Sequence, residues 1–186
     1  MATYNRDSIL IVGWKVTKTS IVSIFLCFLL NISFAVISSF LGNVGLLNVI
    51  FDILLSLVIL YPPLCDHGNA DANLHSFGYI EPDYKRGFII SLFSLIPYWL
   101  ITLPVLIMKL FSLSLFSQYF RLYRVIFSPF TITMMNLCPL TDISSVSYLD
   151  ILVMFLLPLM FVLAGGIFYI FGFKRIAISD KLIYKK

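Results

Sequence analysis

The sequence predicts an all-α integral membrane protein, a bundle of four transmembrane helices that forms one membrane domain over residues 1–186. The chain is 60% apolar and only 12% charged, whereas about 25% of residues are charged in an average soluble domain. Its mean hydropathy is +1.00. The 18 phenylalanines and 10 tyrosines exclude a disordered chain, which needs low hydrophobicity and high charge. Lipid is therefore the expected solvent for most side chains.

Four stretches have the roughly 20 mostly apolar residues that a helix needs to cross a bilayer. The first, 21–41, carries no charge, and the second, 44–61, follows so closely that the two are expected to form an antiparallel hairpin. The third stretch is 87–108 and the fourth is 151–173. All four are expected to span the membrane.

Prolines are expected to shape the second and third helices. Pro62 and Pro63 are predicted to end the second helix, so that residues 62–86 form a cytoplasmic loop. Pro97 and Pro104 lie inside the third span and predict a kink, which neighbouring helices tolerate in lipid.

The segment 110–140 is expected to lie in the interface or to re-enter the membrane, because neither of its halves has the length of a span. In the first half, polar residues recur at helical steps: Ser114, Ser117, Gln118, Arg121 and Arg124. The predicted apolar face of that helix consists of Phe111, Leu115, Tyr119, Leu122 and Ile126. The second half is a short apolar run broken by prolines. If both halves crossed, the protein would have six transmembrane helices, and this alternative stays open.

The distribution of Lys and Arg predicts the orientation. With the N-terminus inside, ten of the 13 basic residues lie on the cytoplasmic side, and only Lys109, Arg121 and Arg124 lie outside. Because basic residues in short loops resist translocation, we expect both termini to be cytoplasmic. The expected location is the plasma membrane, with 174–186 as a basic cytoplasmic tail.

Asp52 is the polar residue that most needs an explanation, because a charge inside a span costs at least about 2.5 kcal/mol. Asn48 lies one turn before it on the same helical face, and Asn31 of the first span is expected at the same depth. We interpret Asp52, Asn48 and Asn31 as candidate ligands for an ion or polar solute near mid-membrane. The alternative is a structural hydrogen bond that holds two helices together.

A weaker pattern suggests a metal site. His67, Asp71 and His75 are spaced at four-residue steps, which places them on one side of a helix at a spacing that can hold zinc. Gly68 and the neighbouring asparagines favour turns instead. A lipid-modifying enzyme built on these residues is a third hypothesis.

The tail also suggests a contact with anionic lipid or with a partner protein, because juxtamembrane basic clusters are attracted to anionic bilayers. A topological anchor is the alternative. Membrane topology already explains the net charge of +4, so no nucleic-acid partner is expected. The basic residues concerned are Lys174, Arg175, Lys181, Lys185 and Lys186.

Common catalytic signatures such as the phosphate-binding loop are absent from the sequence. We therefore expect no enzyme and no cofactor. In size and hydropathy the chain resembles the six-helix substrate-binding subunits of energy-coupling-factor vitamin transporters, although the Ala-x-x-x-Ala motif of those subunits does not occur in the first span. The expected function is a small transport-related membrane component. The alternative is a non-catalytic subunit or assembly factor of a larger membrane complex.

Overall fold

The computed structural model describes residues 7–41, 45–127, 130 and 146–175. Among these residues it contains helices and no strand. The elements are α1 (Ile9–Leu41), α2 (Gly45–Ser76), α3 (Lys85–Leu92), the 3-10 helix η1 (Phe93–Leu95), α4 (Ile96–Leu110), α5 (Phe116–Ile126), α7 (Tyr148–Leu156) and α8 (Leu159–Phe173).

Four segments in the described ranges are long and apolar enough to cross a membrane, which confirms the predicted all-α class with four candidate spans. They are Ile9–Ser33, Leu47–Ser76, Lys85–Leu110 and Tyr148–Phe173.

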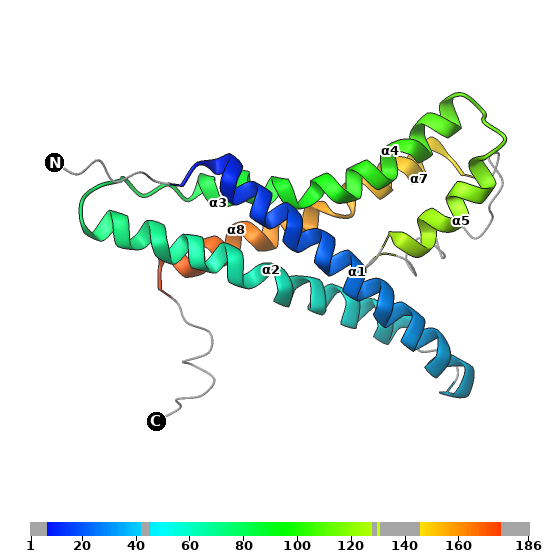
Figure 1. Cartoon of the computed structure of the whole chain (residues 1–186), viewed down its shortest axis with the longest axis horizontal. Coiled ribbons are helices and arrows are strands. Elements are labelled where there is room, and N and C mark those ends of the chain that lie inside the picture. Colours follow the sequence, from blue (N-terminus) through cyan, green and yellow to red (C-terminus); the bar gives the residue numbers. More distant parts are fainter. Residues whose placement is uncertain (1–6, 42–44, 128–129, 131–145, 176–186) are drawn as a thin grey trace.

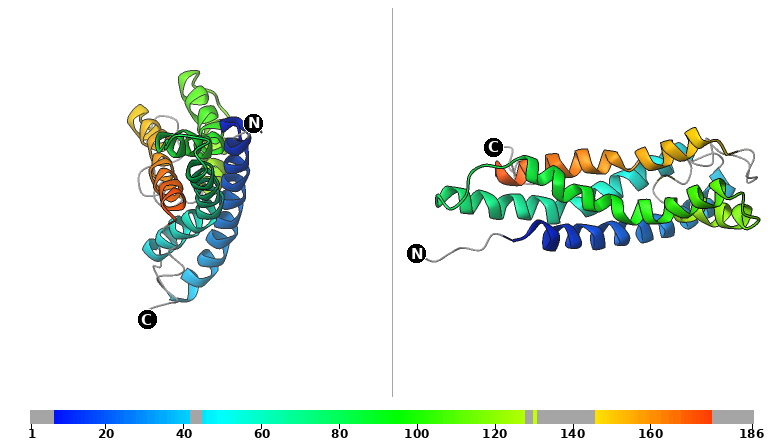
Figure 2. Two further views of the ribbon diagram at one scale, coloured as in Figure 1. Left: turned by 90° about the vertical axis from the view of Figure 1, so that its left-hand side faces the viewer. Right: turned by 90° about the horizontal axis from the view of Figure 1, so that it is seen from above.

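The helices pack side by side into an elongated bundle (Figures 1 and 2). One end consists of the first part of α1, the last part of α2, α3 and α8. At the other end, α4 packs against α5 and α7, while the remaining parts of α1 and α2 extend away from them as a pair (Figure 1). The beginning of α1 and the end of α8 lie at the same end of the bundle, which an even number of crossings requires.

The second helix is longer than predicted, because it continues through Pro62 and Pro63 to Ser76. The predicted cytoplasmic loop 62–86 is therefore wrong over 62–76. An interior proline removes a backbone hydrogen bond and costs about 3 kcal/mol. The helix continues because its last turns pack closely on α8: a Cβ added to Gly172 would lie 2.0 Å from the backbone oxygen of Cys65.

This extension changes the position of Asp52 along its helix. Asp52 follows the first residue of α2 by seven positions, or about 10 Å along the axis, and lies in the first third of the helix instead of near its centre.

The first helix begins earlier than predicted, at Ile9, and it ends at the predicted residue, Leu41. Lys15 and Lys18 are exposed on this added part, and the Lys18 ammonium lies 5.7 Å from the Trp14 ring. Basic side chains near the end of a helix can extend toward the membrane interface, so their charges do not prevent this part of α1 from lying in the membrane.

The connection at 42–44 lies outside the described residues, as does the predicted re-entrant part over 131–140.

The third and fourth spans are both interrupted near their middles. The 3-10 turn η1 precedes Pro97, in line with the predicted kink, and a turn at Leu157 and Pro158 separates α7 from α8. Proline is tolerated at these positions because the first residues of a helix do not donate their backbone N–H groups within the helix, and proline has no such group.

The helix predicted within 110–127 is present as α5, and its predicted apolar face is distinct from the face that packs against the rest of the bundle. Leu115 and Leu122 are exposed, and the buried side chains are the aromatic ones, which form a continuous series of ring contacts with centroids 4.9–5.9 Å apart. The rings belong to Phe116, Phe120, Tyr123, Phe127 and Phe130. The series ends on Tyr98 of α4 and Phe161 of α8, so aromatic packing decides how α5 is rotated.

Candidate functional site

The candidate site is a seam of buried polar side chains between α1 and α2. On α2, Asn48, Asp52 and Ser56 follow one another at one-turn steps and are 4%, 1% and 0% exposed. On α1, Ser23 and Cys27 face them and are fully buried. The sequence places these residue types on matching faces of two adjacent helices, and the structure brings the faces together.

Direct hydrogen bonds join the two helices along this seam. The Ser23 hydroxyl donates to Ser56 Oγ at 2.8 Å, and the Cys27 thiol donates to the backbone oxygen of Asp52 at 3.4 Å. The side chains of Cys27 and Ser56 are also 3.3 Å apart. Further along, Asn48 Nδ2 donates to Asn31 Oδ1. The seam is therefore closed and tightly packed.

Asp52 lies at the centre of these contacts. Its carboxylate interacts with the side chains of Asn31 and Cys27, so the expected proximity of Asn31 and Asp52 is present. Two acceptor oxygens in the seam nevertheless lack a hydrogen-bond donor: Asp52 Oδ1 and Asn48 Oδ1. Buried polar atoms are normally paired, because leaving one unpaired costs about 1–3 kcal/mol.

A third helix also reaches the seam, which the sequence did not predict. Tyr98 at the start of α4 is 1% exposed, and its side chain interacts with Ser23 and Ser56. Its ring is held by Phe127 and Phe161, with centroids 5.9 and 5.7 Å away. The available signal was a tyrosine near the middle of an apolar span, but the chain contains ten tyrosines and this one did not stand out.

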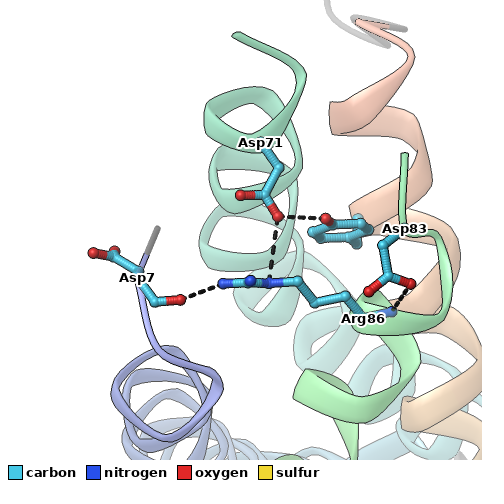
Figure 3. A network of polar contacts seen from close by, with 5 residues as sticks. Asp7, Asp71, Asp83 and Arg86 are labelled. Atoms are coloured by element: carbon cyan, nitrogen blue, oxygen red, sulfur yellow. Dashed lines mark hydrogen bonds and ion pairs between the residues drawn. The ribbon is translucent and has the colours of Figure 1, made fainter. Parts of the chain in front are cut away.

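A second polar cluster, the Arg86 cluster, lies at the end of the bundle where α1 begins (Figure 3). Arg86 of α3 and Asp71 of α2 form an ion pair, with Nε and Oδ2 3.3 Å apart and both side chains less than 10% exposed. The Tyr169 hydroxyl of α8 donates to the same Asp71 oxygen at 2.5 Å. The Arg86 guanidinium also donates to the backbone oxygen of Asp7, and the Arg86 backbone N–H donates to Asp83. The Arg86 cluster thus joins α2, α3, α8 and Asp7, which precedes α1.

The three residues considered for a metal site do not converge. Asp71 is held by Arg86 and Tyr169, whereas the His75 ring contacts the backbone oxygen of Ile80 through Nδ1 at 3.0 Å. His67 is half-buried within electrostatic range of Asp71 and Arg86. No group of three or more His, Cys, Asp or Glu side chains that could hold a metal occurs in the part of the chain that the structure describes.

The first two residues of the basic tail contact the protein itself. The Lys174 ammonium lies 5.9 Å from the Tyr84 ring, and Arg175 donates to the Asn73 side chain at 2.6 Å. Both contacts hold the end of α8 against the end of α2 and the segment before α3. Lys181, Lys185 and Lys186 lie outside the described residues, so the predicted lipid or partner contact of the tail stays a prediction.

Comparison of the chain with protein-family models, curated proteins and solved structures finds no match. The candidate site is therefore interpreted from its own chemistry.

Proposed function

We propose that the protein is a small transport-related membrane component that binds a proton or a small monovalent cation at Asp52, between α1 and α2. The observation that carries the proposal is the pair of buried acceptor oxygens without donors, Asp52 Oδ1 and Asn48 Oδ1. Both are negative or partly negative, and they lie one helical turn apart. A proton on the carboxylate, or a cation between the two oxygens, supplies the missing partner.

The packing of the seam supports a small ligand. Because Asn48, Asp52 and Ser56 are at most 4% exposed, a solute with many atoms does not fit between the helices in this conformation. The surrounding groups are hydroxyl, thiol and amide side chains, and no Lys or Arg of the described residues pairs with Asp52. An intramembrane carboxylate of this kind is a common feature of ion and proton pathways.

The structural alternative is that the seam only holds two helices together. It predicts a hydrogen-bond pattern different from the one observed. Polar side chains between membrane helices stabilise the contact by pairing with one another. The bond between Ser23 and Ser56 does this. A seam with no other role has no reason to leave two buried acceptors without donors.

The proposal is tested by ion-dependent thermal unfolding of the purified protein in detergent. Tm is measured for the wild type over a range of pH and with added Na⁺, K⁺ or Li⁺, and again for Asp52→Asn, which keeps the shape of the side chain but removes the acid. A ligand present at 100 times its Kd adds about 2.7 kcal/mol to stability. We expect Tm of the wild type to rise with protons or with one cation, and we expect this rise to vanish in Asp52→Asn.

Asp66→Asn is the matched control, because Asp66 lies on the same helix and is exposed. It should respond like the wild type. Identical responses of Asp52→Asn and the wild type, or no ion response in either, would contradict the proposal. A second measurement follows ion movement: proteoliposomes holding a pH-sensitive or cation-sensitive dye should dissipate an imposed gradient with the wild type and not with Asp52→Asn.

The alternative proposal, a non-catalytic subunit of a larger complex, has less support. Gly165 and Gly166 of α8 have no side chains, so they form a flat surface on which a helix of a partner protein could pack. Residues of the protein itself already cover this surface: a Cβ added to Gly165 would lie 2.4 Å from Ser91 Oγ, and one added to Gly166 would lie 2.3 Å from the Phe88 ring. The alternative predicts that gentle solubilisation recovers a stoichiometric membrane partner.

A further inference from the structure

A second candidate site lies on a different face of α1, where a pocket of about 530 Å³ opens between α1, α4 and α5. Its walls are formed by Phe25 and Phe28 of α1, Ile101 of α4, and Leu122 and Val125 of α5. This volume falls within the range of about 300–1,000 Å³ that is typical of small-molecule sites. The pocket differs chemically from the polar seam, because its surface is almost entirely apolar.

The lining decides the class of ligand. A polar solute would lose its hydrogen bonds with water on entering and would find no replacement, which costs several kcal/mol for each polar group. A hydrocarbon chain loses nothing in this way. The pocket is therefore suited to an alkyl chain.

The pocket is also reached from the lipid side. Phe25, Leu122 and Val125 are all exposed at its rim, with Leu122 55% exposed. The α1 and α4 walls belong to segments that are apolar and long enough to span a membrane. The acyl chains of the bilayer are thus the molecules that meet the opening.

One cationic side chain beside the pocket identifies the kind of lipid. Arg121 is exposed and lies one helical turn before Val125, on the same face of α5. The other two basic residues of this region are placed against aromatic rings: Lys109 lies 5.9 Å from the Tyr148 ring and Arg124 lies 5.7 Å from the Phe120 ring. The helix α5 contains no acidic residue. Arg121 is therefore available to a negatively charged headgroup.

We propose that this pocket binds one acyl chain of an anionic glycerophospholipid, whose phosphate group contacts Arg121. The chain lies against Phe25, Ile101 and Leu122, and the guanidinium provides the preference for a negative headgroup. This binding goes beyond the ion site at Asp52 and does not depend on it.

The proposal is tested by native mass spectrometry of the full chain, titrated in detergent with phosphatidylglycerol or with phosphatidylcholine of the same acyl chains. A basic residue near a membrane surface contributes about 1 kcal/mol toward anionic lipid, or roughly a fivefold preference. We expect the wild type to bind one phosphatidylglycerol about fivefold more tightly than phosphatidylcholine. The preference should disappear in Arg121→Gln, while Lys85→Gln, a change at an exposed position at the other end of the bundle, should keep it.

Filling the pocket tests the acyl-chain part separately. Leu122→Trp and Val125→Trp place a large ring in the opening at exposed positions, where the fold tolerates it, and should weaken binding of both lipids at least tenfold. Leu100→Trp is the matched control, because Leu100 is 66% exposed on α4 and does not line the pocket. Free glycerol 3-phosphate should not displace the lipid, since it has no chain.

Three results would overturn the proposal. The first is unchanged phosphatidylglycerol binding in both pocket-filling variants. The second is an undiminished lipid preference in Arg121→Gln, or displacement of the lipid by glycerol 3-phosphate, which would assign binding to the headgroup alone. The third is a dimer that Leu122→Trp dissociates, which would make a second copy of the chain the occupant.

Discussion

Arg86 is the residue on which the polar contacts at one end of the bundle converge. Its guanidinium pairs with Asp71 and also holds the backbone oxygen of Asp7, while Tyr169 completes the coordination of the Asp71 carboxylate (Figure 3). The energetic importance of such a pair appears when it is broken. Removing one partner leaves the other charge buried and unpaired, which costs about 3–5 kcal/mol.

We therefore expect Asp71→Asn to lower the free energy of unfolding by about 3 kcal/mol, measured by thermal or denaturant unfolding in detergent micelles. The double variant Asp71→Leu with Arg86→Met should lose less than Asp71→Asn alone, because it leaves no isolated charge. Asp66→Asn, an exposed position on the same helix, should stay within about 0.5 kcal/mol of the wild type. A double variant that is clearly less stable than Asp71→Asn would contradict this account of the pair.

Single residues were predictable from the sequence to different degrees. The proximity of Asn31, Asn48 and Asp52 was expected, because a charge inside an uncharged segment needs polar neighbours and the adjacent helix offered them. The pairing of Asp71 with Arg86 was not expected. Those two residues are 15 positions apart in a segment that was interpreted as a loop, and only the continued helix α2 fixes their relative position.

At the scale of elements, the end of α2 packs against α8 with backbone touching backbone. Gly68 and Gly172 allow it: a Cβ on Gly68 would lie 2.2 Å from the backbone oxygen of Tyr169, and one on Gly172 would lie 2.0 Å from that of Cys65. Small residues let membrane helices approach until their backbones touch. This approach also places Tyr169 beside Asp71.

Gly172→Ala should therefore separate the two helices and destabilise the protein by about 3 kcal/mol, since a backbone atom cannot move aside. Gly166→Ala on the same helix meets only the Phe88 side chain, which can rotate, and alanine gains roughly 0.5–1 kcal/mol of helix propensity. We expect the loss there to be about 1 kcal/mol or less. Unfolding curves of the two variants give the comparison, and an equal or reversed order would show that the α2–α8 contact is not governed by the backbone.

The helices also show where local patterns mislead. Pro62 and Pro63 are strong signals for a helix end, yet α2 continues through them because its last turns pack on α8. In α5, periodicity indicates an apolar face but does not show which side of the helix packs against the other helices. The aromatic contacts with Tyr98 and Phe161 select that side, and these partners are distant in sequence.

At the scale of the whole molecule, the beginning of α1, the end of α2, the beginning of α3 and the end of α8 lie together, and the turn between α4 and α5 lies at the opposite end (Figures 1 and 2). The side of the membrane that each end faces is a prediction from the distribution of basic residues. The end with α1 and α8 is predicted to be cytoplasmic.

This orientation can be measured with single cysteines in a background whose native cysteines are replaced. Glu81→Cys lies between α2 and α3, and Leu113→Cys lies between α4 and α5; both positions are exposed. We expect a membrane-impermeant maleimide to label position 113 in intact cells and position 81 only after lysis. The reverse pattern would place the termini outside, and labelling of both positions from outside would contradict four crossings.

The sequence by itself determined the all-helical class, the four long apolar segments and the polar faces of α1 and α2, because each of these depends on composition or periodicity within one segment. Tertiary structure alone decided where α2 ends, which face of α5 is buried, that Tyr98 reaches the seam and that Arg86 holds Asp71. Each of these outcomes depends on atoms from helices far apart in the chain. The energy of these contacts between helices exceeds the local conformational preferences of proline, glycine and the short apolar repeats. Such contacts cannot be predicted from a pattern within one segment.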